Sequence, residues 1–174
     1  VLLWDPFCGS GTIAIEAALM MTKTAPGIAR HFVCEQFDIL ADGAIAKEER
    51  AKAFAAIDQD SAFEVYASDI DPEVLEIAKA NAERAGVDDR INFFVADARK
   101  IKKLDRRGTV VCNPPYGERL MTQREVERLY REMGDAFSSL SPWQIYILTS
   151  AENFQNLYGR RADKVRKLYN GMIP

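Results

Sequence analysis

Residues 2–12 read Leu-Leu-Trp-Asp-Pro-Phe-Cys-Gly-Ser-Gly-Thr and say more about the architecture than any other part of the chain. Residues 2–4 form a short apolar run of the kind found in buried strands, and a helical pattern of apolar residues follows Thr12. Gly9 and Gly11 carry no Cβ, so the backbone between strand and helix can turn tightly and approach a ligand closely. The following helix offers free N–H groups at its N-terminus to an anion. The stretch therefore predicts a strand, a ligand-binding loop and a helix, in that order.

The rest of the chain alternates between strand-like and helix-like segments, which is typical of a parallel α/β sheet. The predicted strands lie near residues 1–5, 63–68, 91–95, 108–112 and 143–149. The predicted helices lie near residues 11–22, 73–85 and 123–138, with a short one near 152–158. Residues 166–169, followed by Asn170-Gly171, are typical of the first arm of a β-hairpin.

Aspartates follow two of the predicted strands. Asp69 ends the strand at 63–68, and Asp97 comes shortly after the strand at 91–95. Asp71 is expected to cap the next helix, with Pro72 in the first turn. Gly9-x-Gly11-x-x-Ala14 also matches the dinucleotide fingerprint, but that motif expects a ribose-binding acid about 20 residues further on. Asp69 lies far beyond that distance, which argues against NAD.

The motif Asn113-Pro114-Pro115-Tyr116 follows another predicted strand, Thr109 to Cys112. The two prolines donate no backbone N–H, and the first restricts Asn113 to extended geometry. The amide oxygen of Asn113 and the carbonyl of Pro114 are acceptors, and Tyr116 supplies one aromatic ring. Two acceptors beside a stacking ring suit a planar substrate that carries an exocyclic amino group.

These motifs resemble those of a known class of enzymes. Residues 5–12 resemble motif I, and residues 113–116 resemble motif IV, of the amino-methyltransferases that use S-adenosyl-L-methionine to methylate nucleobase or glutamine nitrogens. The resemblance implies a Rossmann-like class I methyltransferase fold, a mostly parallel twisted sheet with helices on both faces, truncated here near strand 7. It assigns Asp69 to the cofactor ribose, Ile70 to the adenine face and Asp97 to the adenine N6 amine. The implied cofactor-binding residues are Asp5, Phe7, Gly9, Gly11, Thr12, Asp69, Ile70, Asp97, Ala98 and Asn113. The implied catalytic residues are Asn113, Pro114 and Tyr116.

Two further stretches narrow the resemblance. Residues 30–37 and the extension Gly117-Glu118-Arg119-Leu120 are similar to the THUMP-associated bacterial 23S rRNA guanine-N2 methyltransferases, once labelled adenine-specific DNA methylases. This resemblance covers nearly the whole chain and implies that residues 1–174 are one catalytic domain, a fragment of a longer protein. Residues 24–62 are expected to be an insertion, either a lid or wall of the base pocket or simply a packed segment. Within it, residues 47–57 are predicted to be helical, with Ala51, Phe54 and Ala55 available for one face.

Composition limits the function further. The chain has 174 residues, a net charge of −3 and three cysteines without metal-ligand spacing. No stretch approaches the ~20 apolar residues of a membrane span and no signal-peptide pattern is found, so a cytoplasmic protein is expected. A negative net charge is unusual for a free-standing nucleic-acid binder, so an RNA substrate would be gripped mainly by domains outside this chain. Two basic clusters nevertheless occur, and the second is the better candidate for RNA contact: Arg99, Lys100, Lys102, Lys103, Arg106 and Arg107, then Arg160, Arg161, Lys164, Arg166 and Lys167.

The favoured hypothesis is methyl transfer to an exocyclic amine of an RNA base, most specifically N2 of a guanine in 23S rRNA, without a metal. Motif IV alone also fits a DNA adenine-N6 or a glutamine-N5 methyltransferase, and a non-catalytic cofactor-binding module is the third alternative. A nucleophilic cysteine, Cys8 or Cys112, is disfavoured because it would need an activating neighbourhood, whereas the Asn-Pro-Pro-Tyr loop supplies amine acceptors.

Overall fold

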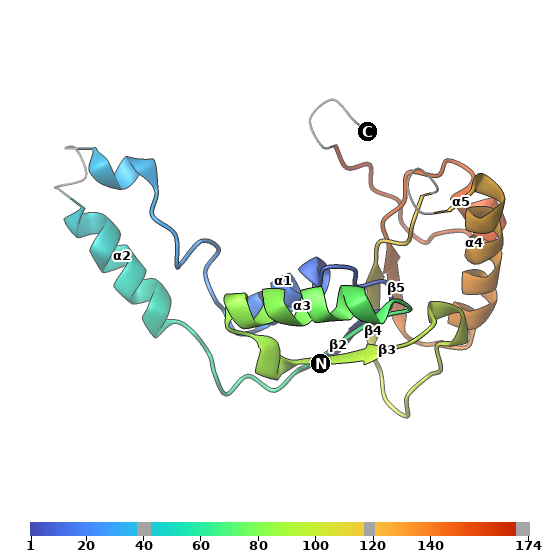
Figure 1. Cartoon of the computed structure of the whole chain (residues 1–174), viewed down its shortest axis with the longest axis horizontal. Coiled ribbons are helices and arrows are strands. Elements are labelled where there is room, and N and C mark those ends of the chain that lie inside the picture. The colour runs from blue at the N-terminus through green and yellow to red at the C-terminus, as the bar shows by residue number, and fades with distance from the viewer. Residues whose placement is uncertain (38–42, 117–120, 170–174) are drawn as a thin grey trace.

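The computed structural model describes residues 1–37, 43–116 and 121–169. Its centre is a five-stranded sheet in which all strand pairs are parallel, in the order β3-β2-β1-β4-β5. The strands are β1 (Leu2–Asp5), β2 (Glu64–Asp69), β3 (Ile91–Val95), β4 (Thr109–Cys112) and β5 (Gln144–Ile147). The parallel α/β sheet predicted from the sequence is confirmed (Figure 1).

The strand order places the two sequence motifs side by side. From β1 the chain builds outward to β2 and β3, and β4 then pairs with the other side of β1 before β5 is added. The order therefore reverses between β1 and β4, and ligands of open α/β sheets bind outside the carboxyl ends of the strands at such a reversal. The loops after β1 and after β4 both begin at this point.

The described residues also form five α-helices and short 3-10 turns, which lie between the strands except for the last helix, which follows β5. The α-helices are α1 (Thr12–Met21), α2 (Ala44–Ala55), α3 (Pro72–Ala85), α4 (Gln123–Ser138) and α5 (Phe154–Tyr158). The 3-10 turns are η1 (Val33–Gln36), η3 (Asp88–Arg90) and η4 (Ala98–Lys100). Asp71 caps α3 as predicted, since its side chain accepts the N–H of Glu73 at 2.9 Å and Pro72 occupies the first turn. In the part of the chain that the structure describes, no helix is long and apolar enough to cross a membrane.

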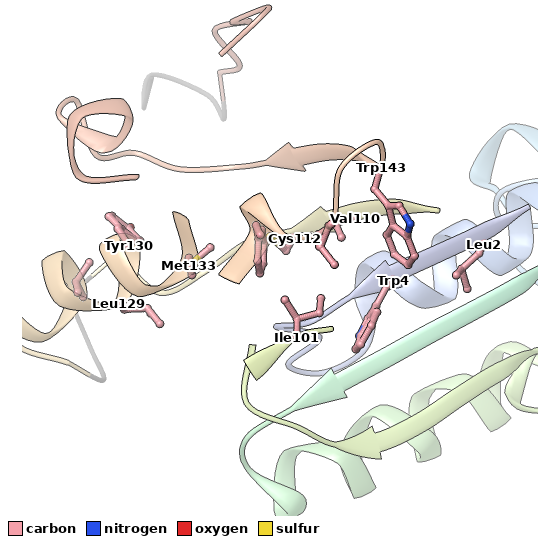
Figure 2. Close-up of a cluster of buried hydrophobic side chains, with 12 residues drawn as sticks. Leu2, Trp4, Ile101, Val110, Cys112, Leu129, Tyr130, Met133 and Trp143 are labelled. Atoms are coloured by element: carbon pink, nitrogen blue, oxygen red, sulfur yellow. The ribbon is translucent and has the colours of Figure 1, made fainter. Parts of the chain in front are cut away.

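Two apolar clusters cover the two faces of the sheet. Successive side chains of a strand point to opposite faces, so Val65 and Ala67 join a cluster with α1 and α3, whereas Tyr66 packs with Trp4 on the other face. The second cluster also holds Val110 and the buried side of α4, as Figure 2 shows. These clusters confirm helices on both faces, and they fix the strand ends on which the motifs lie.

The segment between α1 and β2 corrects one expectation. The described parts of this segment, residues 24–37 with η1 and residues 43–62 with α2, project along the long axis of the molecule, away from α4 and α5 (Figure 1). Ion pairing between Glu35 and Arg50, at 2.7 Å, holds its two parts together. However, α2 buries none of its residues, and Ala51, Phe54 and Ala55 are all exposed. The expectation of a packed helix face is therefore wrong for α2, whereas the alternative of a lid or wall of the base pocket stays a prediction.

A second expectation that differs is the hairpin arm at residues 166–169. These residues are exposed and carry no strand pairing. A β arm exists only through hydrogen bonds to a partner strand, and no described residue supplies that partner. The turn Asn170-Gly171 lies outside the described residues.

Candidate cofactor and substrate site

Gly9 and Gly11 serve different purposes in the loop after β1. Both have left-handed backbone conformations, with φ of 52° and 87°. A Cβ on Gly11 would lie 3.1 Å from the Cβ of Ala78, so this glycine allows α1 to pack closely on α3. A Cβ on Gly9 would meet nothing within 4 Å, so the space beside this glycine is open to a ligand. Thr12 is exposed at the start of α1, and its hydroxyl lies 3.3 Å from that of Ser10.

Asp69 joins the end of β2 to this loop. One carboxylate oxygen accepts the N–H of Gly9 at 3.0 Å, and the other accepts the N–H of Asp71 at 3.2 Å. An ionised carboxylate oxygen has about two acceptor positions, so each oxygen keeps one for a further donor. The side chain is thus fixed in place and can still accept two hydroxyl groups, as a ribose diol would require.

Asp5 is the most unusual polar group of the site. Only 1% of the residue is exposed, its Oδ1 accepts the N–H of Phe7 at 3.1 Å, and its Oδ2 has no partner among the described residues. Burial raises the pKa of Asp5 from 3.8 to about 7; the Phe7 hydrogen bond lowers it and the nearby Asp69 raises it. A buried acceptor without a donor, beside a second carboxylate, fits a ligand that brings a positively charged or N–H-bearing group. Phe7 itself is half-buried against the core.

Asp97 lies just after β3, and both of its carboxylate oxygens already accept hydrogen bonds. Its Oδ1 accepts both the N–H and the Nε–H of Arg99, at 3.0 and 2.8 Å, and its Oδ2 accepts from Nη2 at 2.8 Å. The same guanidinium donates to Glu132 of α4 at 3.2 Å. The pKa of Asp97 lies below its usual range, mainly because the Arg99 side chain donates hydrogen bonds to its carboxylate. Because Oδ1 already accepts twice, Oδ2 is the oxygen that retains capacity for an adenine amine. Ala98, the next residue, is buried.

Two apolar side chains are exposed at the same edge of the sheet. Ile70 is 61% exposed and Val95 is 58% exposed. Val95 is the register partner of Asp69, the residue before Ile70. Sequence reasoning named Ile70 but missed Val95, although its place as the last residue of the predicted strand next to Asp97 was a usable signal. Exposed apolar side chains on neighbouring strand ends suit the flat face of an aromatic ligand.

The Asn113-Pro114-Pro115-Tyr116 loop follows β4 directly, as predicted. Asn113 is exposed, Pro114 is fully buried and Tyr116 is partly buried. The Tyr116 hydroxyl donates a hydrogen bond to the side-chain oxygen of Asn113, so two of the three predicted catalytic residues are in contact through their side chains. The extension 117–120, which supported the RNA resemblance, lies outside the described residues.

The cysteines and basic clusters have environments that limit their roles. Burial raises the pKa of Cys8 to about 12 and that of Cys112 well above its ordinary value, which is the opposite of what a thiolate nucleophile needs. In the first basic cluster, Arg99 pairs with Asp97 and Glu132, and Arg106 pairs with Glu64. The second cluster, at residues 160–167, is exposed along its whole length. No group of three His, Cys, Asp or Glu residues arranged to hold a metal ion occurs within the described ranges.

A parallel sheet with this strand order, carrying a glycine loop after β1 and carboxylates after β2 and β3, defines a Rossmann-like α/β domain of the class I methyltransferase type. Residues 2–174 match the family model described as "RMKL-like, methyltransferase domain". The chain therefore belongs to this family.

Individual relatives agree with the family. The chain is 46% identical over 169 residues to a protein of Bacillus subtilis named "Putative RNA methyltransferase YpsC", an alignment that covers 97% of this chain and 44% of that protein. It is 38% identical to the "Ribosomal RNA large subunit methyltransferase K/L" of Legionella pneumophila, covering 98% of this chain and 24% of that protein. Among solved structures, "SMU.472, a putative methyltransferase complexed with SAH" superimposes with a TM-score of 0.91 at 38% identity, covering 98% of this chain and 45% of that one. The chain thus spans less than half the length of these relatives.

Proposed function

We propose that this chain is a catalytic domain that transfers a methyl group from S-adenosyl-L-methionine to an exocyclic amine of a base in RNA, most specifically N2 of a guanine in 23S rRNA. The observation that carries the proposal is the position of the Asn113-Pro114-Pro115-Tyr116 loop after β4, next to the glycine loop of β1 at the reversal of strand order. The names of the Bacillus and Legionella relatives, and the SAH complex of SMU.472, support it. An rRNA substrate would make the cytoplasm the place of action.

The residues at the carboxyl edge of the sheet fit this cofactor. Asp69 would accept the two ribose hydroxyls, Ile70 and Val95 would flank the adenine, and Oδ2 of Asp97 would accept its N6 amine. The unpartnered oxygen of Asp5 and the open space at Gly9 would receive the positively charged methionine portion. The cofactor supplies a sulfonium-bound methyl group, which is a strong electrophile.

The loop after β4 would orient the substrate amine. An exocyclic amine is a poor nucleophile while its lone pair is delocalised into the ring. The side-chain oxygen of Asn113 and the carbonyl of Pro114 would accept its two protons and favour a pyramidal nitrogen, with the lone pair directed at the methyl group. Tyr116 would stack on a base that has left its helix. Most of the acceleration would come from this alignment. As the nitrogen forms its bond to the methyl group, the bond from sulfur to that methyl group would break with its electron pair going to sulfur, which leaves the neutral thioether, and the nitrogen would lose one proton to water.

The test is methyl transfer from radiolabelled cofactor to rRNA, DNA and protein in parallel. Labelling of rRNA at a guanine supports the proposal, whereas labelling of DNA adenine or of a protein glutamine would select one of the two alternatives. In the protein, Asn113→Ala should lower turnover by roughly 10²–10³-fold while cofactor affinity stays nearly constant, by analogy with the loss of one oxyanion-hole donor. Near-normal turnover in this variant would contradict the amino-methyltransferase assignment.

Tyr116 offers a matched pair of variants. If the ring stacks on the base, Tyr116→Phe should be much milder than Tyr116→Ala, since the ring survives and the Asn113 oxygen loses its internal donor. Equal damage from both changes would assign the function to the hydroxyl instead.

A further inference from the structure

The loop at residues 113–116 depends on an anchor from elsewhere in the chain. Pro114 and Pro115 have no backbone N–H, so the loop cannot be held through donors at these positions. The last ladder contact is at Cys112, whose carbonyl accepts the N–H of Leu148 at 2.9 Å. Beyond it, within the described residues, one hydrogen bond from outside reaches the loop: the hydroxyl of Tyr130 donates to the carbonyl oxygen of Pro115 at 3.0 Å.

Tyr130 is held rigidly for this contact. The residue lies in α4, is fully buried, and joins Leu129 and Met133 in the apolar cluster that Figure 2 shows. The ring of Phe154 meets it edge-on, with centroids 4.8 Å apart, and Phe154 in turn stacks on Tyr158 at 5.2 Å. Burial raises the pKa of Tyr130, so the hydroxyl keeps its proton and acts as a donor. Close packing of the ring on these neighbours keeps the hydroxyl oxygen in one place, from which it donates to Pro115.

We infer that Tyr130 is a positioning residue of the reaction, which holds the Pro115 carbonyl and thereby fixes the place of Tyr116 and of the Pro114 acceptor. The peptide group that contains this carbonyl is planar and also contains the nitrogen of Tyr116, so fixing one end fixes the other. Displacements of about 1 Å in a substrate-orienting group can cost on the order of 10²-fold in rate. The catalytic part of this inference rests on the proposed function, whereas the anchoring of the loop does not.

The test compares two single-hydroxyl deletions in the same aromatic cluster. Tyr130→Phe keeps the buried ring and removes the bond to Pro115, whereas Tyr158→Phe removes a partly buried hydroxyl of α5 for which the described residues show no bond to the loop. With saturating cofactor, kcat for methylation should fall roughly tenfold in Tyr130→Phe, the net value of one hydrogen bond, and the affinity for cofactor should not change. Tyr158→Phe should keep the kcat of the unmodified protein.

A second measurement needs no methyl transfer. The ¹⁵N order parameter of the Tyr116 backbone N–H should drop from a rigid value of about 0.85 to below about 0.6 in Tyr130→Phe, while those of α4 stay high. Tyr158→Phe should leave both sets unchanged. An unchanged Tyr116 order parameter in Tyr130→Phe, or an equal loss of order throughout α4, would overturn the inference. If the unmodified protein methylates no substrate, the proposed function fails, and the order parameters still decide whether Tyr130 anchors the loop.

Discussion

Replacing Asp5 by asparagine should make the free protein more stable at neutral and alkaline pH. In the folded protein the pKa of Asp5 is raised from 3.8 to about 7 by burial. Between these two values the folded state binds the proton more tightly than the unfolded state, so stability falls as pH rises through this window. At about 1.4 kcal/mol for each pH unit, the cost above pH 7 is about 4 kcal/mol.

Asparagine removes this cost because it is neutral at every pH. Its Oδ1 can still accept the N–H of Phe7, but its amide N–H groups would occupy the position where Oδ2 has no partner. Burying such a donor costs about 1–2 kcal/mol, which leaves a net stabilisation of about 2–3 kcal/mol at pH 8. Below about pH 4 the carboxyl group is protonated in both states, and this pH-dependent advantage of asparagine disappears.

Urea unfolding of both proteins between pH 5 and 8.5 measures this difference, with the fluorescence of the neighbouring buried Trp4 as one probe. Carboxylates with lowered pKa, such as Asp97 and Glu132, add a pH dependence of opposite sign. They are present in both proteins and cancel in the difference. A stability difference that does not change with pH, or a variant less stable than the original at pH 8, would refute the reasoning.

The same substitution tests the assignment of Asp5 to the cofactor. If a positive group of the cofactor binds at Asp5, the carboxyl group must lose its proton on binding. Calorimetry at pH 6 in two buffers of different ionisation enthalpy should then show release of about one proton by the original protein, and of almost none by Asp5→Asn. Equal proton release by both would separate Asp5 from the cofactor site while leaving the stability argument intact.

Two pairs of substitutions test the remaining parts of the site. Asp69→Ala should weaken cofactor binding by roughly 2–3 kcal/mol in calorimetry, since it removes the charged acceptor of two hydroxyls, whereas Asp71→Ala should cost about 1 kcal/mol of stability through the lost helix cap and leave affinity unchanged. Unchanged affinity in Asp69→Ala would remove this residue from the site. Gly11→Ala should lower the free energy of unfolding by about 2–3 kcal/mol, because left-handed strain adds to the contact with Ala78, whereas Gly9→Ala should cost only about 1 kcal/mol from strain. Equal losses of stability would contradict the separate roles of the two glycines.

The parts of the fold that sequence predicted well are those decided by local chemistry. Asp71 and Pro72 start α3 because the cap and the proline act within one turn, and this was predictable from adjacent residues. The strands were predictable because short apolar runs were bounded by glycine, proline and aspartate. Their parallel pairing followed from the helices between them.

Sequence reasoning was wrong about burial where burial depends on which other element packs against an apolar helix face. Residues 47–57 carry a pattern that predicts a helix, and α2 forms there with slightly different bounds. The same pattern made Ala51, Phe54 and Ala55 available for one face of that helix, but amphipathicity states which side of a helix could be covered and not whether a partner exists within the chain. The described residues supply no such partner for α2.

The contacts that fix the candidate site were also out of reach of sequence reasoning. Arg99 belonged to a basic cluster, which suggested a solvent-exposed charge, but its guanidinium bridges Asp97 and Glu132, a residue 33 positions away. Tyr130 and Pro115 are 15 positions apart, and the geometry of their hydrogen bond follows from how α4 packs on the sheet. Motifs give the identity of the groups at a site, whereas these longer-range contacts set their positions.

Asp5 shows why the stability of the fold depends on whether a ligand is bound at this site. In the free protein burial and, to a lesser degree, the nearby Asp69 raise the pKa of Asp5, and one Asp5 oxygen has no donor among the described residues. A well-packed neutral residue would make a more stable free fold, which is the basis of the first prediction. A ligand that brings a positively charged donor would stabilise the Asp5 carboxylate and also give its unpartnered oxygen a hydrogen bond. The unfavourable free energy of Asp5 in the free protein would then be relieved on binding and add to the affinity. Because linkage is reciprocal, the same ligand must bind more tightly as Asp5 loses its proton, and its affinity should rise with pH over the window in which the free protein loses stability.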